Sequence, residues 1–117
     1  MKLQLDGIRI RLRLSEAELD ALLAAGRLHQ AWTCADGSTA QCRLVLEPEA
    51  GDGHCAGNLM DLRVGLPRAA FLAFVAERPR RDGFGFGAGP QAVTVEVDVR
   101  DSHRRRREAA AAASGEI

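Results

Sequence analysis

The first 26 residues constrain the fold most strongly, because strand, turn and helix signals follow one another there without contradiction. Apolar residues occupy odd positions before Asp6-Gly7 and even positions after it. Since side chains alternate faces along a strand, this change of parity marks a turn or a bulge. A two-residue type I′ turn at Asp6-Gly7 pairs Leu5 with Ile8 and is the favoured interpretation. One long strand with a bulge at Gly7 is the alternative.

A helix is predicted directly after this hairpin. Ser15 stands at an N-cap position and Glu18 follows three residues later, which is the pattern of a capping box. Leu19 and Leu22 continue at helical spacing, and Gly26 supplies a stop signal. We therefore expect a helix between Ser15 and Gly26.

The rest of the chain alternates strand patterns with one more helix. Strands are predicted over residues 27–35, 39–47, 58–66, 84–86 and 93–99, a helix after Pro67, and a loop over residues 48–57. Short turns join most of these elements, which favours antiparallel pairing. The predicted fold class is α+β, with an antiparallel sheet of about seven strands and two amphipathic helices packed on one of its faces.

Two stretches of the chain share one order of elements. Residues 10–28 and 62–86 both follow the order strand, helix, strand, and Leu-Arg-Leu-Ser and Leu-Arg-Val-Gly precede the two helices. An internal duplication explains the repeat, and chance similarity between two amphipathic units is the alternative.

Length and composition indicate one domain with a tail. The chain has 117 residues, enough for a single domain, which we place at residues 1–100. From Asp101 onward arginine and alanine dominate, and residues 101–117 offer little to bury. We expect this tail to be a frayed helix or disordered.

Charge and cysteine content restrict the compartment and the partners. The formal net charge is zero, so no overall field attracts nucleic acid or an anionic membrane. The longest apolar run, Ala69 to Ala76, is too short to span a bilayer, and no secretory signal is apparent. Three cysteines without such a signal favour a reducing compartment. We therefore expect a cytoplasmic protein that binds no membrane.

The opening residues also resemble a known family. Met-Lys-Leu-x-Leu-x-Gly, the strand Ile-Arg-Leu-Arg-Leu and the Ser-x-x-Glu helix are similar to a small bacterial family, domain-of-unknown-function family 7009. The resemblance is strongest over residues 1–26 and extends in length and element order to about residue 100. Ile8 and Arg9 depart from the polar turn of that family, and Val97-Asp98-Val99 departs from its ending. The resemblance implies a shared fold and a bacterial origin, and no activity.

Four residues are the candidates for metal binding. Cys34 and Cys42 share a predicted strand face across a hairpin, and His54 and Cys55 follow in the predicted loop. Zinc sites usually take closely spaced pairs such as Cys-x-x-Cys, which this chain lacks. Small buried hydrophobic side chains are the favoured interpretation of Cys34 and Cys42. We expect no metal and no other cofactor.

Cys55 beside His54 also suggests a reactive thiol, because a neighbouring imidazolium lowers the pKa of a thiol. Adjacent loop residues rarely hold the geometry that nucleophilic catalysis needs, however. An ordinary exposed cysteine is the favoured interpretation.

Arginines are the candidates for contacts with anions or partners. Cross-strand ion pairs with Glu96 and Asp98 are the favoured interpretation of those in the second strand. Phosphate contact is the alternative. The chain has one tryptophan and no tyrosine, which disfavours a base-stacking surface for nucleic acid. The candidate arginines are Arg9, Arg11, Arg13, Arg104, Arg105, Arg106 and Arg107.

The sequence shows no catalytic constellation, and we predict a protein that is not an enzyme. The leading hypothesis is a protein-interaction or regulatory accessory module that binds a protein partner or associates with itself through a sheet edge. The alternatives are a small-ligand or metal binder that uses the Cys/His loop, and a protein that contacts phosphate or nucleic acid through surface arginines.

Overall fold

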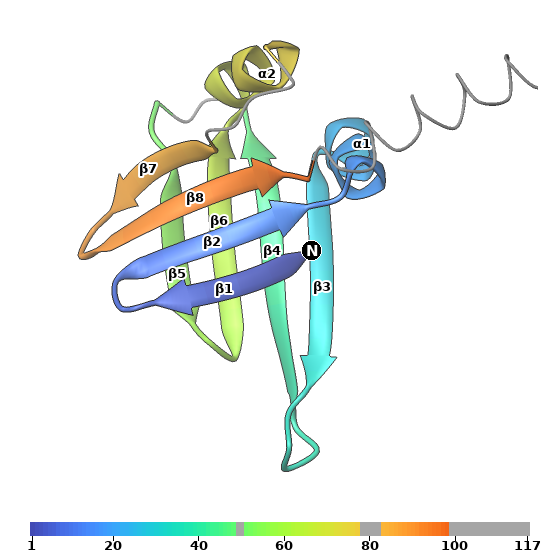
Figure 1. Cartoon of the computed structure of the whole chain (residues 1–117), viewed down its shortest axis with the longest axis vertical. Helices are drawn as coiled ribbons and strands as arrows, with labels where there is room; N and C mark the ends of the chain where they lie inside the picture. The colour runs from blue at the N-terminus through green and yellow to red at the C-terminus, as the bar shows by residue number, and fades with distance from the viewer. Residues whose placement is uncertain (49–50, 78–82, 99–117) are drawn as a thin grey trace, which may run out of the picture.

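The computed structural model describes residues 1–48, 51–77 and 83–98. The predicted tail, with its four consecutive arginines, lies outside the described residues. Figure 1 shows the elements in chain order: β1 (Lys2–Asp6), β2 (Arg9–Leu14), α1 (Glu16–Ala25), β3 (Arg27–Thr33), β4 (Thr39–Glu47), β5 (His54–Asn58), β6 (Asp61–Pro67), α2 (Arg68–Ala76), β7 (Phe84–Ala88) and β8 (Gln91–Val97).

The described strands form two four-stranded mixed sheets. Sheet A has the order β1-β2-β8-β7, and sheet B has the order β3-β4-β6-β5. Each sheet consists of two antiparallel hairpins joined at its centre by a parallel pair, β2 with β8 in sheet A and β4 with β6 in sheet B. The α+β class is confirmed, whereas the single antiparallel sheet of about seven strands is wrong. Alternation along the chain identifies faces and hairpins, but it does not show which distant strands become neighbours.

Each half of the chain repeats the order strand, strand, helix, strand, strand. The first half runs from β1 to β4 and the second from β5 to β8. In each half the helix carries the chain from one sheet to the other, so both sheets receive one hairpin from each half. The order predicted for residues 10–28 and 62–86 is therefore present, and it extends by one strand on each side.

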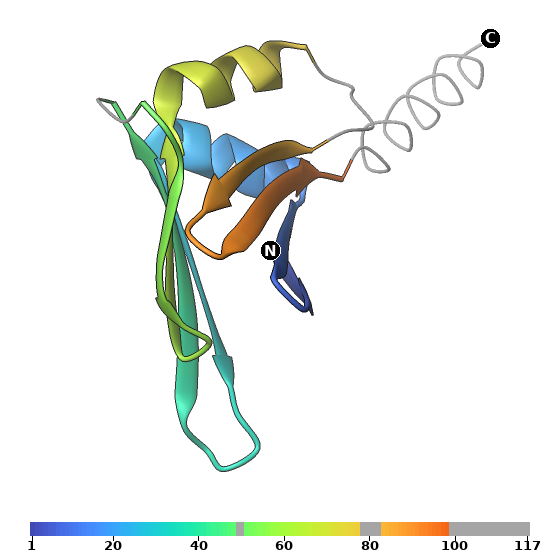
Figure 2. The ribbon, with the colours of Figure 1, turned by 90° about the vertical axis from the view of Figure 1, so that its left-hand side faces the viewer.

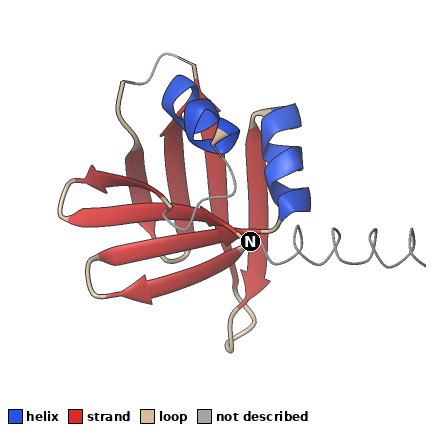
Figure 3. Ribbon diagram, turned by 45° about the horizontal axis from the view of Figure 1, so that its top comes forward, coloured by secondary structure: helices blue, strands red, loops and turns tan. Residues whose placement is uncertain are grey.

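The two sheets pack face to face, with strands that cross at a steep angle (Figure 1). Both helices lie at one end of this sandwich (Figure 3), because each must connect the two sheets. α1 contacts β3 and β4, and α2 contacts β6, so both helices pack against strands of sheet B at this end. The buried apolar residues are Ile10, Leu12, Leu14, Leu19, Leu22, Ala40, Cys42, Leu44, Leu46, Leu62, Val64, Leu66, Phe71, Phe74, Val93 and Val95.

The local signals of the opening segment are confirmed, with one correction of register. Ser15 and Glu18 form the capping box, and Gly26 ends α1 in the left-handed region at φ 76°. In the first hairpin Leu5 pairs with Ile10, not with Ile8. Gly7 takes a positive φ at the first turn position, as in a type II′ turn, and Ile8 becomes an exposed turn residue.

A strand occupies part of the predicted loop. β5 runs from His54 to Asn58 and pairs with β6, so the loop predicted over residues 48–57 is wrong in its second half. The glycines of this segment are typical of turns, and for that reason the sequence did not predict a strand there. Met60 falls within the strand predicted over residues 58–66, but it lies in the β5–β6 turn and is 44% exposed.

A matched pair of substitutions tests whether the helices close the core. Leu22→Ala on α1 removes a fully buried side chain and is expected to lower the free energy of unfolding by about 2–5 kcal/mol. Leu72→Ala on α2 alters an exposed side chain and is expected to cost less than about 1 kcal/mol. Urea denaturation of both variants measures the difference. Equal losses would contradict the packing described here.

Candidate functional site

The two sheets meet closely along one side of the sandwich. There β7 contacts β5, and the ring of Phe86 lies directly over Gly53, where a Cβ atom would come within 2.6 Å of that ring. Phe84 packs edge-on against Phe71 with ring centroids 5.5 Å apart, and its ring lies 6.3 Å from that of Phe86. Aromatic rings therefore fill the space between the sheets on this side.

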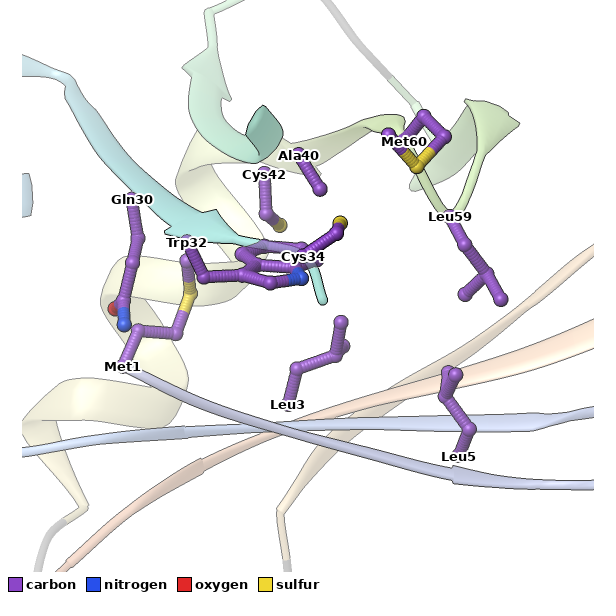
Figure 4. A pocket seen from close by; sticks show the side chains of 10 residues that line it. All are labelled: Met1, Leu3, Leu5, Gln30, Trp32, Cys34, Ala40, Cys42, Leu59 and Met60. Carbon is purple, nitrogen blue, oxygen red and sulfur yellow. The ribbon is translucent and has the colours of Figure 1, made fainter. Parts of the chain in front are cut away.

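The opposite side, between β1 and β3, is open as a cleft of about 500 Å³. Figure 2 shows the β1–β2 hairpin standing away from sheet B. In Figure 4 Leu3 points toward Trp32, and Leu5 points toward Leu59 of the β5–β6 turn. The residues that line the cleft are Met1, Leu3, Leu5, Gln30, Trp32, Cys34, Ala40, Cys42, Leu59 and Met60.

Differences between the two halves of the chain account for this cleft. In the β3–β4 hairpin Gln30 pairs with Cys42, whereas at the corresponding place of the β7–β8 hairpin Phe86 pairs with Val93. A phenylalanine ring thus fills the closed side, while an amide and a thiol stand on the open side. The pair Gln30 and Cys42 is smaller and more polar than the pair Phe86 and Val93. It therefore leaves a space on the open side that corresponds to the space filled by Phe86 on the closed side.

The mouth of the cleft exposes apolar surface. Leu59 is 55% exposed, Leu5 46% and Met60 44%. Large aliphatic side chains normally avoid water, and a group of them around one opening indicates a binding surface. An apolar guest at the mouth would therefore bury aliphatic surface that is otherwise exposed to water.

Gln30 supplies the amide of the cleft. It lies on the inward face of β3, half-buried, and within the part of the chain that the structure describes its side chain has no hydrogen-bond partner. None of the ten lining residues has a charged side chain. The cleft can therefore satisfy one polar group of a neutral guest and offers no side-chain counter-ion.

Two of the cysteines are held as neutral thiols. Cys42 lies buried on β4, and burial raises the pKa of its thiol to about 11, with a further contribution from nearby Cys55. Burial also raises the pKa of Cys55. Both thiols are therefore protonated at neutral pH, which is the opposite of the activated thiolate that a neighbouring imidazolium would produce.

The four candidate metal ligands do not come together. His54 lies on the outer face of β5, with its Nε2 2.5 Å from Oε1 of Glu47, whereas Cys55 packs against the core. Cys34 and Cys42 line the cleft on the inner face. Among the described residues no group of three His, Cys, Asp or Glu side chains is placed to hold a metal ion.

The arginines of β2 are engaged within sheet A. Arg11 donates to the Glu96 carboxylate from Nη2 at 2.8 Å and from Nε at 3.2 Å, and Nη2 of Arg13 lies 3.5 Å from the same group. These contacts confirm the predicted cross-strand ion pairs for Arg11 and Arg13. Because the pairs are partly exposed, each contributes roughly 0.2–1 kcal/mol. Arg9 has no such pair among the described residues, and Arg104 to Arg107 lie outside them.

Of the ten residues that line the cleft, the sequence singled out only Cys34 and Cys42, as candidate metal ligands, and it did not indicate a cleft. Trp32 and Met60 fall within the strands predicted over residues 27–35 and 58–66, and neither carried a signal of a binding site. The one available signal was Gln30, a polar side chain at an inward position between Leu28 and Trp32. An inward polar residue on an otherwise apolar strand face indicates a cavity or a close partner.

Comparison with known proteins identifies no relative of this chain. No family model matches the chain, and no curated protein or solved structure is significantly similar to it. Neither of the described helices has the length and apolar character needed to cross a bilayer.

The raised pKa of Cys42 predicts a loss of stability at alkaline pH. The unfolded thiol ionises near pH 9, whereas the folded thiol resists ionisation up to about pH 11. Stability is therefore fully present below pH 9 and falls as the pH rises through 11, by at most about 3 kcal/mol. The chain has no tyrosine and one lysine, so few other groups titrate in this window.

Urea denaturation at several pH values between 8 and 11 measures this loss. Cys42→Val, which copies Val93 of the other half, is expected to flatten most of the pH dependence and to leave a smaller slope from Cys55. The same slope in the variant and the original protein would show that Cys42 is not the responsible group.

Proposed function

We propose that this chain is a cytoplasmic, non-enzymatic binding module whose site is the cleft between β1 and sheet B. The guest is a neutral, largely apolar group that fills the cleft and places one polar atom near Gln30. The observation that carries the proposal is an apolar cleft of about 500 Å³ at the open side of the sandwich.

The size and lining of the cleft support binding. Sites for small molecules or partner groups typically enclose roughly 300–1,000 Å³ and combine an apolar lining with a few polar groups. The cleft falls within this range and carries one amide among aliphatic, aromatic and thiol side chains. Burial of an apolar guest there gains roughly 25 cal/mol for each Å² removed from water.

The side chains of the cleft favour binding over catalysis. None of the lining residues is an aspartate, glutamate, histidine or lysine, so no side chain there can serve as a carboxylate or imidazole base. The Cys42 thiol is held protonated and is a poor nucleophile at neutral pH. A neutral apolar cleft without acid–base groups is typical of a binding site.

The other two hypotheses have less structural support. A metal site would lack one of its candidate ligands, because His54 lies on the outer face of β5 and contacts Glu47. Two of the arginines on β2 that could bind phosphate, Arg11 and Arg13, are already paired with the Glu96 carboxylate.

Fluorescence of Trp32 tests the proposal directly. Trp32 is the only tryptophan of the chain and lines the cleft, so its emission reports occupancy without a label. The neutral probe N-phenyl-1-naphthylamine is expected to quench Trp32 saturably while its own emission rises. Its anionic analogue with a sulfonate group is expected to bind more weakly, because no cationic side chain lines the cleft.

Two variants of the first hairpin provide the matched control. Leu5→Glu places a charge at the mouth of the cleft and is expected to weaken probe binding roughly tenfold. Ile8→Glu places the same charge on an exposed turn residue outside the lining and is expected to leave binding within about twofold. Absence of saturable quenching, or equal effects of both variants, would refute the proposed site.

A further inference from the structure

The outer face of sheet B carries a row of basic side chains. Arg43 on β4 is paired in register with His29 of β3 on one side and with Arg63 of β6 on the other. All three side chains are exposed, and Figure 2 shows that no other described element covers this face. Neighbouring strands lie about 4.8 Å apart, so the two arginines project from adjacent positions. Together with the exposed Arg27 of β3, these residues form the outer basic patch.

The arginines of the outer basic patch lack the counter-ions that sheet A provides. On β2, two arginines share the Glu96 carboxylate. Arg27, Arg43 and Arg63, in contrast, form no ion pair with another described residue. Like charges at directly opposite positions of neighbouring strands repel each other. A fold that keeps Arg43 beside Arg63 without an acidic partner therefore favours an anionic ligand.

An apolar hollow adjoins the outer basic patch. Val45 is 38% exposed in it, lies opposite Arg27, and follows Arg43 along the same face of β4. The hollow has a volume of about 500 Å³, and its lining residues are Ala25, Arg27, Leu28, His29, Arg43 and Val45. None of these six residues is acidic, so the hollow combines cationic groups with an apolar floor. Such a combination is typical of sites for ligands that have a polar end and an apolar body.

We infer that the hollow and the adjoining arginines form a second binding site, which takes a phosphate monoester with an apolar body. The phosphoryl group would lie between Arg43 and Arg63, and the body would cover Val45 and extend toward Ala25 at the end of α1. Arginine donates paired hydrogen bonds to phosphate oxygens, and two guanidinium groups balance the charge of about −2 that such a group carries at neutral pH. This site is separate from the cleft and does not depend on the function proposed for it.

Carboxylates on either side of the outer basic patch favour a small ligand over an extended polyanion. Asp61 lies in the next row of the sheet, opposite Gln41. Glu47 lies two residues beyond Val45 on β4, where it contacts His54. A nucleic-acid strand needs a basic track that follows its backbone, and on this face it would meet these acidic groups within one or two residues of the arginines. A single phosphoryl group fits between them.

Titration with 1-naphthyl phosphate, followed by methyl NMR of the full chain, tests the inference. We expect the methyl resonances of Val45 to shift saturably, while those of Leu5 and Leu59 in the cleft stay in place. 1-Naphthol has the same body without a charge, and 1-naphthoic acid carries a single negative charge. Both are expected to bind at Val45 roughly tenfold more weakly, because neither balances two guanidinium groups.

Substitutions of exposed residues provide a matched set of variants. Arg43→Gln and Arg63→Gln each remove one guanidinium group of the site and are expected to weaken binding of 1-naphthyl phosphate roughly tenfold. Arg9→Gln removes the same charge from an exposed position of sheet A and is expected to change binding by less than about twofold. Val45→Thr keeps the shape of the side chain and should weaken binding of the monoester roughly threefold, while binding of inorganic phosphate stays the same.

Each contrary outcome overturns the inference. No shift at Val45 would mean that the hollow takes no such ligand. Equal losses in Arg9→Gln and Arg43→Gln would mean that overall charge, and not the patch, attracts the monoester. Equal affinity for inorganic phosphate and 1-naphthyl phosphate would mean that the apolar floor takes no part. Tighter binding of a deoxythymidine oligonucleotide than of the monoester would assign the arginines to nucleic acid. None of these results bears on the cleft, because its occupancy is measured with a neutral probe and Trp32.

Discussion

Parallel pairing of β2 with β8, and of β4 with β6, is the constraint on which the rest of the structure depends. Each half of the chain supplies two hairpins, and these two contacts join hairpins from different halves into sheets. Because a helix must then connect the two sheets in each half, both helices lie at the same end. The core forms where these central strands face one another. The side chains of the outer strands then determine whether each side of the sandwich is closed or open.

The two outer sides differ because corresponding positions carry different side chains. Phe86 over Gly53 brings β7 against β5, whereas Gln30 on β3 leaves β1 at a distance from sheet B. A nearly symmetrical arrangement of strands thus carries one filled side and one cleft. The cleft has the apolar lining of a core and the exposure of a surface, which is why we regard it as the functional part of the molecule.

Local features of the fold were predictable from the sequence, and long-range ones were not. The capping box of Ser15 and the strand over residues 39–47 follow from nearest neighbours in the chain, and both are confirmed. The parallel pairs join residues far apart in sequence, and the alternation of polar and apolar residues does not indicate which strands form them. The cleft depends on such pairs, since Leu5 and Leu59 come to line the same space only after both sheets have formed. Gln30 at an inward position was the one local sign of it.

The most direct test of the account is to locate a bound probe by methyl NMR. During titration with N-phenyl-1-naphthylamine, the methyl resonances of Leu3, Leu5 and Leu59 are predicted to shift together with one dissociation constant. Those of Val45 on the outer face of sheet B and of Leu72 on α2 are predicted to stay in place. Shifts confined to Val45 or Leu72, with the cleft methyl groups unchanged, would contradict the claim that the space between β1 and sheet B is the binding site.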